Sequence, residues 1–184
     1  MRLHIKQGAA WIKNGGVIAY PTEAVYGLGC DPLDQAAVHR LLALKQREAS
    51  MGLILITDTF DRIEAFLEPM VDSHRARLQK TWPGPVTWLI PAQAWVPDWL
   101  TGDTHMIAVR VTDHPIAAAL CQDADMPIVS TSANIHGRRP AQTTLQVHRQ
   151  FDQQLDYIVP GKTGNQSKPT MIKELVSNKV LRSA

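Results

Sequence analysis

The sequence predicts a single-domain α/β protein, built as a twisted open mixed sheet with flanking helices. Short apolar runs such as "GVIAY" at 16–20, "GLILIT" at 52–57 and "PIV" at 127–129 are typical of strands that are buried on both faces. Longer stretches between them carry apolar residues at helical spacing. Because these strands and helices do not alternate strictly, we expect mixed pairing rather than an all-parallel sheet.

Local signals place the elements in order along the chain. A helix over residues 3–14 ends at Gly15, a cap at Asp34 starts a helix through "QAAVHRLLALKQ", and Pro115 stands in the first turn of a third helix. The strand "VIAY" is followed by a turn at "GLG". The other expected elements are helices from Asp58 or Thr59, over 72–80 and at "TLQVHRQF", and strands at "PVTWLIP", "MIAVRVT", "MPIVSTSAN" and, as the last strand, "DYIVP".

Length and composition indicate one domain over residues 1–184. A chain of this length buries about 70% of its unfolded surface, and no Pro- or Gly-rich linker divides it. Its two cysteines are far from a disulfide framework and predict a reducing compartment. The N-terminus lacks the apolar core of a signal peptide, and no window approaches 18 apolar residues. We therefore expect a cytoplasmic protein without a membrane segment.

Charge is distributed unevenly along the chain. The net formal charge is +2, but residues 138–184 hold eight Lys or Arg and three acidic residues, a net charge of +5. Such a basic segment attracts phosphate, whether in a nucleotide or in RNA. The alternative is a solvated basic face without a ligand.

Polar residues that interrupt apolar strands are candidates for a site. In the extended segment "STSAN", Ser130, Ser132 and Asn134 would point the same way, just past a buried strand, where open α/β sheets bind ligands. A Ser/Asn-rich turn is the alternative. Arg110 interrupts the strand "AVRVT". A buried guanidinium needs an anionic partner, which is either an internal carboxylate or a substrate carboxylate or phosphate.

Two further segments carry candidates. In "LKQRE", Lys45 and Arg47 would diverge on a helix but point the same way in extended chain beyond a helix end. They form either a phosphate clamp or two cations that compensate a helix C-terminus. In "WPGPVT", two prolines fix the entry into a strand on which Thr87 faces opposite Val86 and Trp88. A purely structural turn is the alternative there.

Several common chemistries have no signature in this sequence. It contains no "GxxxxGK[ST]" or "GxGxxG" nucleotide loop, no "HExxH", no paired "CxxC" and no "GxSxG". The seven histidines are scattered, so we expect no resident metal site. A Ser–His–Asp triad is not excluded by spacing, but no feature favours one.

Together, "YPTEAVYGLGCDP", "LKQR", "WPGPVT", "VRVTDHP" and "STSAN", in this order and spacing, resemble the YrdC-like family from about Gly8 to Ile172. The resemblance implies an open α/β sheet with a concave basic cleft. It also implies a nucleotidyltransferase that makes L-threonylcarbamoyladenylate from L-threonine, bicarbonate or CO2 and ATP, with Mg2+ accompanying ATP and pyrophosphate released. Partner proteins of the family then transfer the threonylcarbamoyl group to tRNA. A two-domain branch has a further C-terminal domain, which we expect this chain to lack.

The resemblance also assigns roles to individual residues. Lys45 and Arg47 would neutralise charge on the triphosphate during catalysis. The positions that match L-threonine contacts are Thr22, Tyr26, Arg110 and Ser130. The positions that match ATP contacts are Lys45, Arg47, Thr87, Ser132 and Asn134. No nucleophilic side chain and no metal ligand is implied.

The stretch "TEAVYGLG" would then form the rim of the substrate cleft. Thr22 would supply a hydroxyl, Tyr26 a wall, and the glycines a close backbone approach. The alternative is that Thr22 caps a short helical turn with Glu23 in its first turn.

Some positions depart from the family pattern. Glu48 and Gly52 stand where many members have proline, Ile56 where the two-domain branch often has a substrate-facing histidine, and His136 in place of a serine after "SAN". The stretch "KPTMI" matches only loosely a family "PST" block. These departures affect loop contacts and one threonine contact.

Two other functions fit part of the same pattern. An RNA-binding or ribosome-assembly factor would use the basic cleft without catalysis and bind tRNA or double-stranded RNA in a salt-dependent way. However, aromatic residues make up only 6% of the chain, and they form no stacking platform for RNA. A carbamoyltransferase of hydrogenase maturation shares the fold but is a much longer protein.

Overall fold

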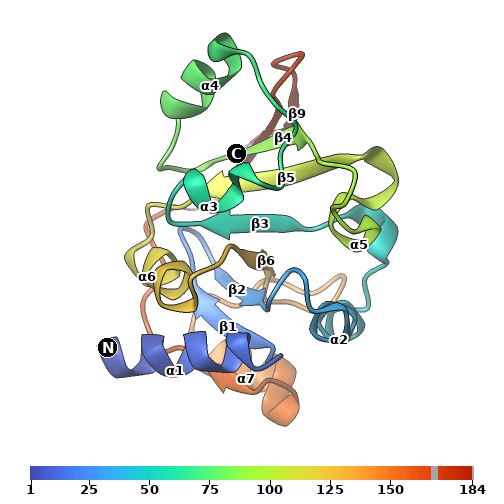
Figure 1. Cartoon of the computed structure of the whole chain (residues 1–184). Helices are drawn as coiled ribbons and strands as arrows, with labels where there is room; N and C mark the ends of the chain where they lie inside the picture. Colours follow the sequence, from blue (N-terminus) through green and yellow to red (C-terminus); the bar gives the residue numbers. More distant parts are fainter. Residues whose placement is uncertain (167–169, 184) are drawn as a thin grey trace.

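The computed structural model describes residues 1–166 and 170–183. In this part of the chain, nine strands form one sheet in the order β7-β1-β2-β6-β3-β5-β4-β8-β9, flanked by helices (Figure 1). The elements are α1 (Arg2–Lys13), β1 (Ile18–Pro21), β2 (Tyr26–Gly29), α2 (Gln35–Lys45), η1 (Ala49–Met51), β3 (Ile54–Thr57), α3 (Asp61–Glu64), α4 (Asp72–Gln79), β4 (Val86–Pro91), α5 (Asp98–Thr101), η2 (Gly102–Thr104), β5 (Met106–Val111), α6 (Pro115–Ala124), β6 (Ile128–Ser132), α7 (Thr144–Phe151), η3 (Asp152–Gln154), β7 (Tyr157–Ile158), β8 (Met171–Glu174) and β9 (Val180–Arg182).

The sheet is mixed, as the sequence predicts. β3 pairs in parallel with β5 and antiparallel with β6, while β1 and β2 form an antiparallel pair. β6 also pairs antiparallel with β2, so it joins the two halves of the sheet. Strands that are neighbours in the sheet are often far apart in the sequence, so the central strands bring residues from distant segments side by side.

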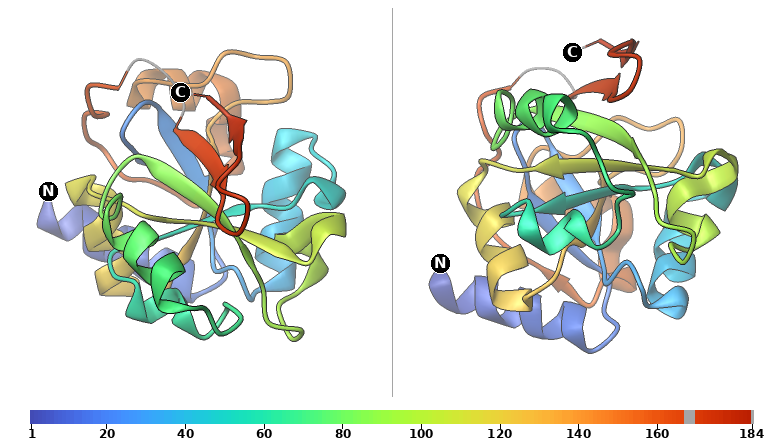
Figure 2. Two further views of the ribbon diagram at one scale, coloured as in Figure 1. Left: turned by 90° about the horizontal axis from the view of Figure 1, so that it is seen from above. Right: turned by 45° about the horizontal axis from the view of Figure 1, so that its top comes forward.

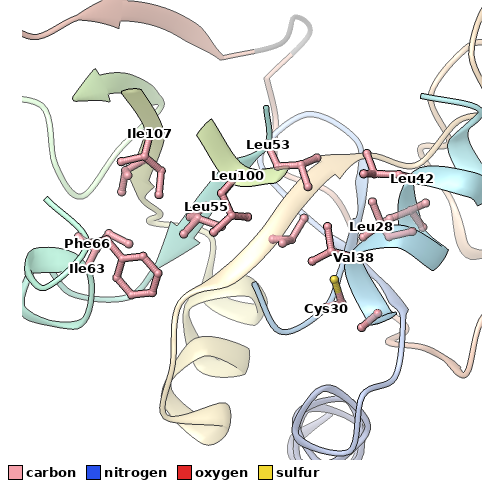
Figure 3. Packing of buried hydrophobic residues seen from close by; sticks show 14 of the residues in the cluster. Leu28, Cys30, Val38, Leu42, Leu53, Leu55, Ile63, Phe66, Leu100 and Ile107 are labelled. Carbon is pink, nitrogen blue, oxygen red and sulfur yellow. The ribbon is translucent and has the colours of Figure 1, made fainter. Parts of the chain in front are cut away.

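The central strand β3 is buried on both faces. Leu53 and Leu55 point into the larger core cluster, which the sheet forms with α2 and the segments near α3 and α5 (Figure 3). Ile56 points the other way, into a smaller cluster that the sheet forms with α1 and α6. Each large side chain buried in this way contributes about 1.5–3 kcal/mol. Burial on both faces explains why the run "LILIT" has no polar face.

The predicted helix starts are confirmed at two caps. The side chain of Asp34 accepts a hydrogen bond from the backbone N–H of Ala37 at 3.0 Å, at the start of α2. α6 starts at Pro115, with His114 as its cap residue. The helix that was expected from Asp58 or Thr59 begins later, at Asp61, and is only one turn long.

The stretch "GLG" forms part of β2 and is not a turn, so that expectation is wrong. Gly27 and Gly29 alternate with Leu28 and therefore share one face of the strand. The ring of Tyr20 lies against this face: a Cβ at Gly29 would meet Tyr20 Cε1 at 2.7 Å and the Val129 carbonyl oxygen at 2.4 Å. The glycines leave space for an aromatic ring on a neighbouring strand.

We predict that Gly29→Ala lowers the free energy of unfolding by about 1–3 kcal/mol, because the added methyl group clashes with backbone that cannot move alone. Gly27→Ala on the same face has its nearest contact at 3.3 Å and should cost less. Chemical denaturation of the two variants tests the difference, and equal stabilities would contradict this account of β2.

The stretch "DYIVP" is not the last strand. Only Tyr157–Ile158 is a strand there, and the chain continues into the hairpin β8–β9. β8 pairs in parallel with β4, so the hairpin (red) extends the end of the sheet opposite to α1 (Figure 2). Its short strands carry no buried apolar face, since all of β9 is exposed. A pattern based on burial could not reveal it.

Among the described residues, no helix combines the length and the apolar character that crossing a bilayer requires.

Candidate active site

A cavity of about 180 Å3 opens where the central strands meet the turn after β1. The turn contributes Thr22 and Glu23, and the segment after α2 contributes Arg47. The sheet contributes Gly27, Ile54, Arg110, Ser130 and Ser132. Thr170 and Arg182 reach it from the C-terminal hairpin region.

Strand register explains why residues far apart in sequence meet here. Ile54 on β3 lies opposite Ser130 on β6, and Ile56 lies opposite Arg110 on β5. Because alternate residues of a strand share a face, Arg110 and Ser130 point to the same side of the sheet. The absence of a side chain at Gly27, opposite Ser132, keeps this side open.

The turn at residues 22–25 is held by Thr22. Its hydroxyl donates to the Val25 carbonyl at 2.8 Å, and its backbone N–H donates to the same oxygen at 3.0 Å. No helix begins there, so Thr22 is not a helix cap. The turn places Thr22 and Glu23 at the edge of the cavity.

Arg110 has an internal carboxylate partner, which is one of the two alternatives that the sequence left open. Its NH2 nitrogen lies 3.0 Å from Oε2 of Glu23, and both side chains are only 6% exposed. Glu23 Oε1 accepts a hydrogen bond from the Thr112 hydroxyl at 2.5 Å. Since Arg110 also lines the cavity, the ion pair does not exclude a substrate contact.

The cavity is electropositive. Arg47, Arg110 and Arg182 line it together with the single carboxylate of Glu23, a net formal charge of +2 among the described lining residues. Burial lowers the pKa of Arg47, and the charge of Arg182 lowers it further. Three guanidinium groups held this close are stabilised by anions, so the cavity suits a carboxylate or a phosphate.

Lys45 is the last residue of α2, and Arg47 follows just after the helix end. Gln46 adopts the left-handed conformation with φ 52°, which ends the helix between them. Arg47 then donates to the Gly52 carbonyl at 2.8 Å and reaches the cavity. The two cations thus lie neither both on the helix nor both in extended chain, because Lys45 is the last residue of α2 and the left-handed Gln46 separates it from Arg47.

Lys45 lies behind the cavity wall. Its ammonium group donates to the carbonyls of Ser132 and, at 3.0 Å, Asn134. Burial lowers the pKa of Lys45 to about 8, with a further contribution from the Arg47 charge. An ammonium group has three donors, so one donor remains for a ligand.

The "STSAN" residues divide between the cavity and the loop behind it. Ser130 and Ser132 line the cavity, whereas Asn134 does not. Asn134 accepts from the Ser132 hydroxyl at 2.6 Å and donates to the carbonyls of Ile135 and Arg138. Asn134 therefore shapes the loop that presents Ser132. Its contact with a nucleotide stays a prediction.

Thr87 lies one layer away from the open space, and Tyr26 lines it while its hydroxyl is bonded elsewhere. Thr87 is fully buried, and its hydroxyl lies 3.3 Å from that of Thr170, which lines the cavity. Tyr26 borders the cavity, but its side chain belongs to the larger core cluster and its hydroxyl donates to the Gly161 carbonyl at 2.7 Å. The structure gives both side chains a supporting place, and their substrate contacts stay predictions.

The departures from the family pattern have local explanations. Gly52 has φ 61°, and a Cβ there would lie 2.9 Å from the Leu100 carbonyl oxygen, so neither proline nor another side chain fits. The backbone N–H of His136 donates to the Lys45 carbonyl at 3.0 Å, which ties its loop to the segment just before Glu48. Glu48 makes no side-chain cap at the start of η1. Part of "KPTMI" lies outside the described residues.

Ile56, which stands where the two-domain branch often has a substrate-facing histidine, lies away from the cavity. Ile56 is fully buried in the smaller core cluster and does not line the cavity. Ile54, two residues earlier on the same face, does line it. The apolar side chain that lies beside Ser130 in the cavity wall is therefore Ile54.

Sequence reasoning gave no site role to several lining residues, among them Glu23, Thr170 and Arg182. Glu23 was visible as an acidic residue between a buried strand and a cluster of polar residues. Arg182 belongs to the basic C-terminal quarter, but only the fold of the hairpin shows that it turns inward, where it donates to the Thr170 carbonyl at 2.8 Å.

Known proteins resemble this chain in sequence and in fold. The family model Sua5_yciO_yrdC, described as "Telomere recombination", matches residues 10–184. The chain belongs to this family. A threonylcarbamoyl-AMP synthase from Nitrosococcus oceani is 54% identical over 170 residues, which are 92% of this chain and 92% of that protein.

Two solved structures of family members superpose closely on this chain. P. abyssi Sua5 complexed with L-threonine has a TM-score of 0.92 at 30% identity, covering 99% of this chain. The match covers 54% of Sua5, so this chain spans about half of that protein. E. coli YciO has a TM-score of 0.85 at 28% identity, covering 100% of this chain and 90% of its own.

Proposed function

We propose that this protein is a threonylcarbamoyl-AMP synthase. It condenses L-threonine, bicarbonate or CO2 and ATP to L-threonylcarbamoyladenylate and pyrophosphate, and it acts as a nucleotidyltransferase in tRNA modification. The observation that carries this proposal is the small cavity with three guanidinium groups and one carboxylate, which suits an amino-acid carboxylate beside a phosphate chain. Relatives with this printed name match nearly the whole chain.

The size of the cavity supports a division of the site. Its volume of about 180 Å3 is below the about 300–1,000 Å3 typical of pockets for drug-sized ligands. L-threonine would occupy the enclosed part, with its carboxylate on Arg110 and with Thr22 and Ser130 beside it. ATP would lie toward Arg47, Lys45 and Ser132, with Thr87, Tyr26 and Asn134 supporting the walls.

The chemistry needs placement and charge neutralisation, and no protein nucleophile. The deprotonated threonine amine adds to CO2 with loss of a proton, or to bicarbonate with loss of water, and a carbamate forms. A carbamate oxygen then attacks the α-phosphorus of ATP, the bond to the β-phosphate oxygen breaks, and pyrophosphate leaves with the electron pair. Arg110 would hold the substrate carboxylate in place, while Arg47 and Lys45 would stabilise charge on the phosphates.

Mg2+ would enter with ATP. Within the described ranges, no group of three or more His, Cys, Asp or Glu side chains is placed to hold a metal ion. Glu23, the carboxylate at the cavity, is already paired with Arg110. We therefore assign Mg2+ to the triphosphate, as is usual for nucleotide substrates.

Partners and location follow from the same activity. A cytoplasmic transferase complex would receive the adenylate and modify tRNA. The basic residues that surround the cleft offer a contact for tRNA or another double-stranded RNA.

The experiment that tests the function is pyrophosphate release from ATP and bicarbonate, with and without L-threonine. We expect release only when threonine, bicarbonate and Mg2+ are all present, and we expect the adenylate product by mass spectrometry. Folded protein that releases no pyrophosphate with threonine would contradict the proposal. A salt titration of tRNA binding would then test the RNA-binding alternative.

A further inference from the structure

A buried acidic side chain that lines the cavity has no direct part in the reaction described above. Glu23 is only 4% exposed, and its carboxylate lies between Arg110 and Thr112. Burying a carboxylate is costly unless it is paired. The contacts of Glu23 with Arg110 and Thr112 therefore indicate its role.

The carboxylate is fixed on the side away from the cavity. Thr112, which does not line the cavity, donates its hydroxyl to Glu23 Oε1 at 2.5 Å. The same Thr112 oxygen accepts the backbone N–H of His114 at 3.2 Å, where α6 begins. The orientation of the carboxylate is thus tied to the junction of β5 and α6.

The backbone of Glu23 is fixed as well. Its carbonyl accepts the N–H of Gln166 at 3.1 Å, and the chain at Gly164 packs so closely that a Cβ there would lie 2.6 Å from that carbonyl oxygen. Gly164 in turn donates its N–H to the Thr22 carbonyl at 2.9 Å. Glu23 therefore presents its carboxylate from a rigid place.

Arg110 keeps donors that this contact does not use. Its NH2 lies 3.0 Å from Glu23 Oε2 as an ion pair, but within residues 1–166 and 170–183 neither that oxygen nor the buried Nε of Arg110 has a hydrogen-bond partner. A guanidinium has five N–H donors in a planar fork, so fixing one edge also fixes the direction of the others. The remaining donors are available to an anion in the cavity that Arg110 lines.

We propose that Glu23 is a positioning residue for threonine binding. The chain of contacts from Thr112 through Glu23 holds the Arg110 guanidinium so that its remaining donors face the carboxylate of the substrate. This inference rests on the proposed function. A free arginine side chain would have to be ordered when the substrate binds, and holding it in advance removes that cost from binding.

The variant Glu23→Gln tests this role in the full chain. Glutamine can still accept the Thr112 hydrogen bond, but it carries no charge toward Arg110. Isothermal calorimetry should show L-threonine binding weakened about tenfold, as expected for loss of a buried ion pair that orients Arg110, with ATP binding within about twofold of wild type. In turnover, KM for threonine should rise while kcat at saturating threonine is largely kept.

Thr112→Val provides a second variant that leaves Glu23 in place. Thr112 does not line the cavity, and the only side chain to which its hydroxyl donates among the described residues is Glu23. We expect a weakening of about threefold. Thr112→Ser keeps the hydroxyl and should bind threonine more tightly than the valine variant.

Glu64→Gln is the matched control, because Glu64 pairs with Arg75 at 2.5 Å away from this cavity. Its threonine and ATP affinities should equal those of wild type. Unchanged threonine binding in Glu23→Gln, or an equal loss for threonine and ATP, would overturn the proposal. If Glu23→Gln does not fold, the Thr112 pair decides, and equal affinities of the valine and serine variants would overturn it. Wild-type protein that binds no threonine would instead refute the proposed function.

Discussion

Arg110→Ala should raise the KM for L-threonine by about 30-fold or more, because truncating one partner of a buried charged pair costs about 2 kcal/mol at the least. ATP binding should change little, since the proposed contacts of the phosphates are with Arg47 and Lys45 and not with Arg110. Steady-state pyrophosphate release at varied threonine and fixed ATP measures the effect. A variant with wild-type threonine affinity would remove Arg110 from the binding site.

The same substitution leaves Glu23 buried without its partner, which by itself destabilises a fold by about 3–5 kcal/mol. The double variant Arg110→Ala/Glu23→Gln removes that unpaired charge, so it should be more stable than Arg110→Ala while binding threonine no better. Arg110→Lys keeps the charge but not the planar fork, and its threonine KM should lie between those of wild type and alanine. Thermal unfolding of each variant separates loss of folding from loss of binding.

The general architecture was predictable from the sequence because it depends on local signals. Runs such as "LILIT" are apolar on both faces of a strand, and Asp34 and Pro115 mark helix starts by their chemistry. The hairpin β8–β9 was not predictable in this way. Its strands are short and largely exposed, and they are held by pairing with β4 rather than by an apolar pattern.

The glycines of β2 show why a local interpretation fails when packing decides. Two glycines one residue apart are usual in turns, but Gly27 and Gly29 lie under the ring of Tyr20, which comes from the neighbouring strand. Nothing within the stretch "GLG" indicates this ring. Only the pairing of β1 with β2 does.

In the candidate site, too, the sequence predicted residues with local signals but not those whose position depends on tertiary packing. Sequence placed Thr22, Arg47, Arg110, Ser130 and Ser132 together, and all of them line one cavity. It did not place the inward turn of Arg182, because that depends on the position of the hairpin. Nor did it indicate that Ile54 lines the cavity, whereas Ile56, which matches a substrate-facing position of the two-domain branch, is buried in the core.

Lys45→Ala should lower kcat by about 100-fold, the usual effect of removing one electrostatic donor from a transition state, with threonine binding little changed. The ammonium group donates to the carbonyls of Ser132 and Asn134 and has one donor left for the phosphates. Lys45→Met, which keeps the apolar stem without the charge, should be as slow as alanine. An unchanged rate would remove Lys45 from the mechanism.

The pH dependence gives an independent test of the Lys45 charge. Burial lowers its pKa to about 8, so the cation is present below that pH and is lost as the pH rises through it. The rate of pyrophosphate release should therefore fall on the alkaline side. The threonine amine reacts when deprotonated, so its titration alone would raise the rate with pH and cannot cause this fall. In Lys45→Arg the guanidinium stays charged, and whatever activity remains should show no alkaline fall near pH 8. A wild-type rate that keeps rising above pH 9 would show that the charge of Lys45 is not required.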